Sequence, residues 1–197
     1  LSVADGEWAT VASAADDAAD VLRQRAVGPV GVAGWSAGGR VALALAARHP
    51  DLVDRVVILA TPAPDETVPW VSPENRQSLE ALRGLPPEEV HQRLAAQLGQ
   101  QMPADAPRET LLAALGRRPA DDEAFALPGA AERLDAMLRA AFAQGTIGLA
   151  ADIAGYTLKP WGFEPGEVRA KTLCLYGSRD PAIASRHGSW WQKALPQ

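Results

Sequence analysis

The stretch from Pro29 to Arg48, PVGVAGWSAGGRVALALAAR, decides how this 197-residue chain folds. A short apolar run leads into Gly34-Trp35-Ser36-Ala37-Gly38, and an alanine-rich pattern typical of a helix follows at once. This order predicts a strand, a sharp turn and a helix, with Ser36 at the apex of the turn. We expect glycine at positions 34 and 38 because side chains there would collide with the neighbouring strand and helix.

The G-x-S-x-G spacing makes Ser36 a candidate nucleophile. A serine on such a turn has a strained backbone that lifts its hydroxyl above the sheet. The helix starts just after it, so the free N–H of Ala37 points at the reaction centre and is a candidate oxyanion donor. The alternative is a Gly/Ser loop that binds a phosphate. The strand and helix on either side favour the nucleophile, and the glycines fit neither G-x-G-x-x-G nor a Walker loop.

The first third of the chain has the rhythm of an α/β protein. Residues 2–26 have apolar residues at helical spacing, Val30–Ala33 is a short apolar strand, and 37–48 is a second helix. Arg55–Ala60 is a strand without polar alternation, which indicates burial on both faces, as in a parallel sheet. Helix, strand, helix, strand in this order predicts a mostly parallel sheet flanked by helices.

The rhythm stops after Ala60. Between Asp65 and Gly155 we find no convincing strand, only short helices separated by Gly and Pro, which we expect near residues 72–82, 87–99, 108–115, 130–144 and 146–156. We interpret residues 62–163 as a helical cap between two parts of a core formed by 1–61 and 164–197. Insertions at the strand ends of α/β proteins cover ligands, although a helical bundle without a functional role fits the same pattern.

The chain returns to the core with the strand Lys171–Tyr176, which is followed by the turn Gly177-Ser178-Arg179-Asp180-Pro181. We expect a helix over 182–195 after this turn, with a break near Gly188. Asp180 therefore lies at the carboxyl edge of the sheet, the same edge as Ser36. Asp65, which follows the preceding strand, is a rival acid. Its proline-rich surroundings are more typical of a cap hinge, and we prefer Asp180.

Together the elbow, the strand after it, the helical insert and the acid turn resemble the α/β-hydrolase fold superfamily, in particular actinobacterial esterase, haloperoxidase-like and peptidase-like hydrolases. The resemblance covers nearly the whole chain. It implies that Ser36 is the nucleophile, Asp180 the triad acid and the Ala37 amide one oxyanion donor. It also implies a serine hydrolase that cleaves an ester or related acyl bond of a small molecule through an acyl-enzyme, without a cofactor.

The resemblance also implies that parts of the fold are missing from this sequence. The family opens with further strands, which supply the second oxyanion donor, and its histidine follows one more strand after the acid. We therefore expect a fragment, with exposed apolar edges on its sheet and with the catalytic histidine beyond Gln197. His187 is the one histidine here that follows Asp180, and it is the other candidate base. A non-catalytic binding protein on this fold and a cofactor-free haloperoxidase or peptidase-like enzyme remain alternatives.

Composition excludes several other classes of protein. The chain has 24 acidic and 19 basic residues, a net charge of −5 and no basic stripe, which argues against a nucleic-acid partner. We expect no membrane span, no metal site and a cytoplasmic location, although the sequence begins at Leu1 and a leader could precede it. The single cysteine, Cys174, is expected to be buried and structural. Trp35 and Trp70 are candidates for the substrate pocket, and the oligomeric state is open.

Overall fold

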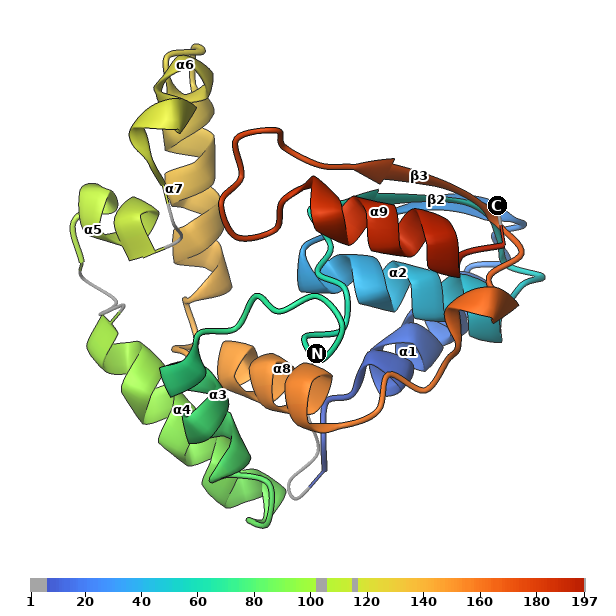
Figure 1. Cartoon of the computed structure of the whole chain (residues 1–197), viewed down its shortest axis with the longest axis horizontal. Helices are drawn as coiled ribbons and strands as arrows, with labels where there is room; N and C mark the ends of the chain where they lie inside the picture. The colour runs from blue at the N-terminus through green and yellow to red at the C-terminus, as the bar shows by residue number, and fades with distance from the viewer. Residues whose placement is uncertain (1–6, 102–105, 115–116, 197) are drawn as a thin grey trace. The chain divides into compact units, whose positions relative to one another are not determined.

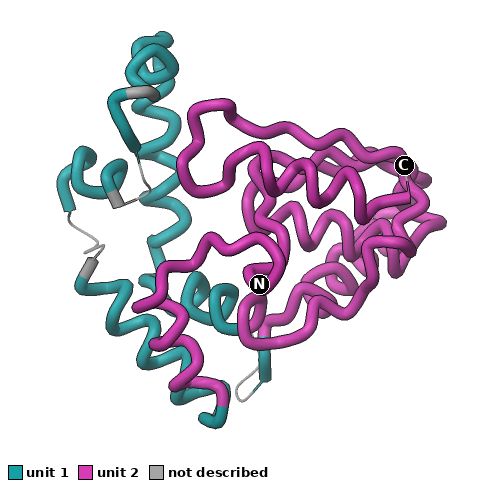
Figure 2. Tube along the Cα trace, in the orientation of Figure 1, with its two compact units in different colours: residues 1–8, 84–154 teal, residues 9–83, 155–197 magenta. Residues whose placement is uncertain are grey.

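The computed structural model describes residues 7–101, 106–114 and 117–196 of the chain. The chain divides into two compact units, shown in different colours in Figure 2. One contains residues 84–154 together with the N-terminal residues up to Trp8, and the other contains residues 9–83 and 155–197. The second unit carries the sheet, the serine elbow and the acid turn.

The sheet has three strands in the order β1 (Val30–Trp35), β2 (Val53–Leu59) and β3 (Lys171–Leu175). Both pairs are parallel, and the register places Ala33 beside Val57 and Val57 beside Leu173. All three strands therefore end at one edge. This is the edge that the sequence predicts for Ser36 and Asp180.

Two helices, α2 (Ala37–Arg48) and α9 (Ser185–Ala194), cover one face of this sheet, and α1 (Val11–Gln24) packs against α2 (Figure 1). The buried core lies between these helices and the strands. Its fully buried members include Leu43 of α2, Ile58 of β2 and Trp191 of α9. Because successive strand residues point to opposite faces, only every second residue of each strand reaches this core.

The opposite face of the sheet is exposed, which corrects the prediction that β2 is buried on both faces. Trp35 is 63% exposed, Leu173 54% and Leu175 44%, and Val57 and Leu59 between them are half-buried. None of the described helices of this unit packs on that face. A continuous apolar run such as that of β2 is typical of a strand that is buried on both faces of its sheet, but here helices cover only one face.

Local sequence signals explain where the helices begin. α1 starts at Val11 rather than earlier, because Thr10 is its N-cap and forms a capping box with Ser13. α3 (Pro73–Glu80) starts as the sequence predicts, with the Ser72 hydroxyl accepting the amide of Asn75. α9 is unbroken at Gly188, where the backbone passes so close to the Tyr176 ring that a Cβ would lie 2.7 Å from it.

The other unit is helical and has its own small core. Its elements are α4 (Pro87–Gln101), α5 (Arg108–Ala114), η1 (Pro119–Asp121), α6 (Asp122–Phe125), α7 (Ala130–Ala141) and the first part of α8 (Ile147–Leu158). Leu111, Leu112 and Leu138 are buried together there. The expected cap, 62–163, is longer than this unit. Residues 62–83 and 155–163 cluster with the sheet unit instead, as does η2 (Pro165–Glu167).

Candidate active site

Ser36 lies between β1 and α2 in a backbone conformation that side chains rarely adopt, with φ 52° and ψ −125°. Its amide donates to the carbonyl of Leu59 at 2.8 Å, which fixes the turn to β2. A serine at a helix N-cap usually accepts an amide of the first turn, but the Ser36 hydroxyl makes no such bond. Ser36 is half-buried, and strain of this kind is characteristic of functional sites.

The elbow glycines that have no room for a side chain are Gly34 and Gly39, rather than the predicted Gly34 and Gly38. A Cβ at Gly34 would lie 2.5 Å from Gly39 Cα and overlap the Gly38 carbonyl, as expected. At Gly38 a Cβ would meet nothing within 4 Å, so the expected collision there is wrong. Gly39 carries that constraint, because a Cβ there would overlap Thr61 Oγ1 and lie 2.9 Å from Thr61 Cβ and Cγ2.

The amide of Ala37 is the first of helix α2. The first four amides of a helix have no acceptor within the helix, and the helix dipole adds positive potential at this end. Ala37 is half-buried and next to Ser36, so its N–H suits a negative charge that develops beside the serine hydroxyl.

A buried turn of three residues, Thr61-Pro62-Ala63, links the elbow to the acid turn. The Thr61 carbonyl accepts the hydroxyl of Tyr176 at 2.8 Å and the indole N–H of Trp191 at 3.2 Å. Burial raises the pKa of Tyr176, so its hydroxyl stays a donor. The Thr61 side chain packs against Gly39. From the sequence this proline-rich stretch is typical of a hinge, and no pattern in it predicts the contacts with Tyr176, Trp191 and Gly39.

Asp180 follows β3 at the carboxyl edge, two strands from Ser36. Its Oδ1 accepts the amides of Ala182 and Ile183, both at 2.9 Å. These bonds hold the carboxylate in one orientation, and Oδ2 has no hydrogen-bond partner among the described residues. An acid that orients an imidazole needs this arrangement, with one oxygen fixed and the other available.

His187 is fully buried in α9, on the side that faces the core. Its Nδ1 accepts the amide of Ala63 at 3.1 Å, so Nε2 carries the proton. Burial and the nearby charge of Arg186 lower the pKa of His187. A catalytic base must reach both the serine and the substrate. The burial of His187 and its bond to Ala63 therefore argue against the prediction that His187 is a candidate base. They make it a packing residue that holds the turn.

The other two histidines have structural partners. His49 lies at the far end of α2 from Ser36, where Nε2 bonds to Asp16 at 2.8 Å and Nδ1 contacts Arg23 at 3.1 Å. His91 belongs to the helical unit, where it is 9% exposed and packs edge-on against Trp8. In the described part of the sheet unit, His49 and His187 are both held in these structural contacts, and neither is placed to serve as the base for Ser36.

The rival acid Asp65 is occupied by the chain around it. Oδ1 accepts the amides of Trp70 and Val71, both at 2.8 Å, and Oδ2 accepts two bonds from Arg76 at 2.9 and 2.6 Å. These bonds outweigh burial, so the pKa of Asp65 is lowered. Asp65 thus organises the segment that leads into α3, which supports our preference for Asp180.

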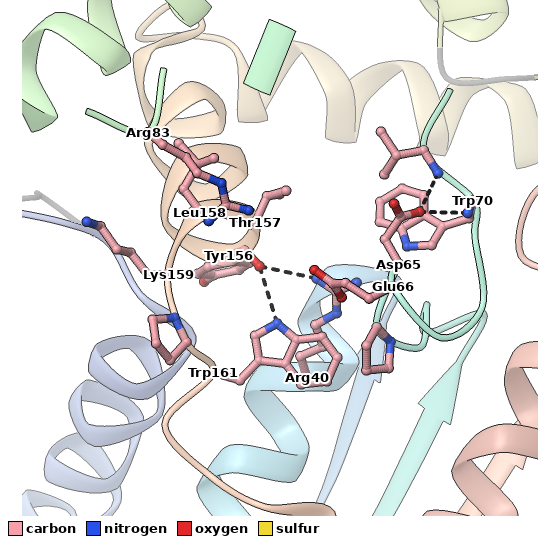
Figure 3. Close-up of a pocket in the computed structure, with 13 residues that line it drawn as sticks. Arg40, Asp65, Glu66, Trp70, Arg83, Tyr156, Thr157, Leu158, Lys159 and Trp161 are labelled. Atoms are coloured by element: carbon pink, nitrogen blue, oxygen red, sulfur yellow. Dashed lines mark hydrogen bonds between the residues drawn. The ribbon is translucent and has the colours of Figure 1, made fainter. Parts of the chain in front are cut away.

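The two candidate substrate-binding tryptophans lie in different places. Trp35 is the last residue of β1, directly before Ser36, and its side chain lies on the exposed face of the sheet. Trp70 lines a cavity of about 350 Å³ within the sheet unit, together with Arg40, Tyr156 and Trp161 (Figure 3). Ser36 does not line this cavity.

No group of three or more His, Cys, Asp or Glu side chains in residues 7–101, 106–114 and 117–196 could hold a metal ion. Within the same ranges, no helix combines the length and apolar character needed to cross a membrane.

Relatives of known structure share the arrangement of the chain. An esterase from Thermogutta terrifontis matches 99% of this chain and 64% of its own, with a TM-score of 0.61 at 20% identity. A hydrolase from Pseudomonas aeruginosa matches 99% of this chain and 63% of its own, with a TM-score of 0.57 at 23% identity. At these identities the likeness concerns the fold alone.

One sequence relative is closer. The pimeloyl-[acyl-carrier protein] methyl ester esterase of Chromobacterium violaceum is 31% identical over 189 residues, which are 92% of this chain. The chain spans 64% of the length of that esterase. The family model described as alpha/beta hydrolase fold matches residues 6–197. With its parallel strands, its serine elbow and a match over nearly its full length, the chain belongs to the α/β hydrolase fold family.

Proposed function

We propose that the protein is a serine hydrolase that cleaves an ester of a small molecule through an acyl-enzyme. The observation that carries this proposal is the backbone of Ser36. A φ of 52° at a non-glycine residue, with a hydroxyl that does not cap its helix, is a strained arrangement of the kind that is found at functional sites. The esterase relative supports the reaction class, since it is named for the hydrolysis of a methyl ester.

In this mechanism the Ser36 hydroxyl attacks the ester carbonyl, and its proton passes to a histidine. The oxyanion accepts the Ala37 N–H. The histidine then protonates the leaving alcohol, which leaves an acyl group on Ser36. Water attacks the acyl group, its proton returns through the histidine, and the free acid departs. Asp180 orients the histidine through Oδ2. We propose that this histidine lies beyond Gln197, as the family resemblance implies.

The test is covalent labelling of the full-length protein with a fluorophosphonate, followed by peptide mapping. We expect one label per molecule on Ser36, and a fall of about 1,000-fold or more in p-nitrophenyl acetate hydrolysis for Ser36→Ala. Ser189→Ala, which removes an exposed hydroxyl of α9, is the matched control and should keep full activity.

The alternative is a non-catalytic binding protein on the same fold. It is favoured by one observation, that both described histidines of the sheet unit, His49 and His187, are held in structural contacts. A full-length protein that is folded, does not react with the probe and has equal background hydrolysis in both serine variants would establish the alternative and reject the enzyme.

A further inference from the structure

Arg40 is a buried cation that forms no ion pair with any carboxylate of the described residues. It lies on α2, four residues after Ser36, and is 4% exposed. Its Nε donates to the carbonyl of Pro62 and its Nη1 to the carbonyl of Tyr156, both at 3.3 Å. Both acceptors are neutral and both bonds are long. Burial lowers the pKa of Arg40 to about 10, yet the group remains charged at neutral pH.

Two indole rings hold the guanidinium in place. The Cζ atom of Arg40 lies 4.5 Å from the ring centroid of Trp161 and 5.8 Å from that of Trp70, and Figure 3 shows these three residues together at the cavity. Aromatic faces stabilise a cation by an amount that does not replace an ion pair. Nη2 has no hydrogen-bond partner among the described residues, and Arg40 lines the cavity of about 350 Å³.

The acids near Arg40 do not neutralise it. Asp65 raises the pKa of Arg40 by its charge, but its carboxylate is bound to Arg76 and two amides. Glu66 raises it more than Asp65 does, but Glu66 is exposed, so water weakens its charge without removing it. No carboxylate of the described residues forms an ion pair with Arg40.

The remaining charges on the cavity wall are positive. Arg83 lines the cavity and pairs with Glu80, which lies outside it. Lys159 also lines the cavity. The cavity thus offers a fixed guanidinium without an ion pair beside aromatic side chains, which suits an anion with a short carbon chain.

We propose that this cavity is a carboxylate subsite, and that Arg40 binds a carboxylate that the ester substrate carries away from its scissile bond. This inference rests on the proposed function and names its substrate class. Arg40 follows Ser36 by four positions, and four helical residues rise about 6 Å along the axis of α2. In this proposal the ester lies at Ser36 and the carboxylate at Arg40, which describes a half-ester of a short dicarboxylic acid.

The test compares two esters of one acid, monomethyl glutarate and dimethyl glutarate, with the full-length protein. We expect Arg40→Gln to lower kcat/KM for the half-ester by about 10- to 100-fold, the loss expected for a charge-assisted hydrogen bond, and to leave the diester within about 3-fold. Arg40→Lys, which keeps the charge, should restore part of the loss. Equal losses on both esters would overturn the subsite and make Arg40 only a structural link between Pro62 and Tyr156.

A second variant, at an exposed residue, tests the proposal in case the Arg40 variants do not fold. Glu66→Gln removes an exposed acid from the cavity wall and leaves the buried contacts in place. Because it removes repulsion toward an anion, we expect it to raise the preference for the half-ester by about 2- to 3-fold at low salt. An unchanged or lower preference contradicts the proposal.

Binding separates this inference from the proposed function. Glutarate itself is titrated into the Ser36→Ala protein, with the fluorescence of Trp70 and Trp161 as the signal. Glutarate binding that Arg40→Gln weakens by about 10-fold or more supports the subsite even if no ester is ever hydrolysed. Ester hydrolysis without Arg40-dependent glutarate binding keeps the enzyme and rejects the subsite.

Discussion

Gly39→Ala and Gly38→Ala differ by one position in the elbow, yet the structure predicts opposite effects on stability. Both residues lie in the first turn of α2, and alanine there gains up to about 0.5–1 kcal/mol of helix propensity in each case. At position 38 the new methyl group meets nothing within 4 Å. At position 39 it would overlap Thr61 Oγ1 and lie 2.9 Å from Thr61 Cβ and Cγ2.

Thr61 has little room to yield to this methyl group. Its side chain is fully buried, and its carbonyl is held by Tyr176 and Trp191. Inserting a methylene into a packed core costs about 1–3 kcal/mol, and we expect the upper part of that range here. Because the propensity gain is common to both variants, we expect Gly39→Ala to be less stable than Gly38→Ala by about 2–3 kcal/mol.

Thermal unfolding followed by circular dichroism measures this difference. In a domain of this size 1 kcal/mol shifts Tm by about 2–4 °C, so the two variants should unfold roughly 5–10 °C apart. Adding Thr61→Ala to Gly39→Ala should recover part of the loss, because it removes the overlapping hydroxyl. Equal Tm values for the two glycine variants, or a lower Tm for Gly38→Ala, would refute the packing argument.

Three further predictions concern strain, pH and the exposed sheet face. Ser36→Gly relieves the backbone at φ 52° and should stabilise the protein by about 1 kcal/mol in urea unfolding while it abolishes fluorophosphonate labelling; a destabilised variant would show that Ser36 is not strained. Burial lowers the pKa of His187 in the folded state, so below the ordinary value of 6.5 the unfolded state binds the proton of this histidine more tightly. The free energy of unfolding should therefore decrease as the pH falls below 6.5. His187→Asn, which keeps an acceptor for the Ala63 amide, should flatten unfolding midpoints between pH 5 and 7.5, and unchanged slopes would contradict the assignment. Leu173→Lys, on the exposed sheet face, should reduce self-association in light scattering at little cost in Tm, whereas Ile58→Lys on the covered face should unfold the protein.

Local sequence was enough to predict the elements that position the site. The apolar run before Ser36, the alanine pattern after it and the proline at position 50 define β1 and α2 without tertiary information. Ser72 as the cap of α3 was predicted for the same reason, since its partner Asn75 is three residues away. Signals of this kind act within one turn of a helix or one strand.

Contacts between distant residues could not be predicted in the same way. Which elbow glycine is essential depends on Thr61, 22 positions after Gly39, and no pattern in the sequence brings the two together. The coverage of β2 on one face rather than two depends on what packs against it, and its run of apolar residues is the same in either case. The environment of His187 depends on the position of Ala63 for the same reason.

The turn at residues 61–63 explains how the elbow and the acid turn keep their relative position. Ser36 and Asp180 follow β1 and β3, which are not adjacent and share only β2. Strand pairing alone fixes the backbone ends, but the residues beyond those ends need further support. The Thr61 carbonyl accepts a hydrogen bond from the hydroxyl of Tyr176, which directly follows β3. The Thr61 side chain packs against Gly39 at the start of α2. Thr61 thus contacts both segments that carry the proposed catalytic residues, so changes at Thr61 should affect Ser36 and Asp180 together rather than either alone.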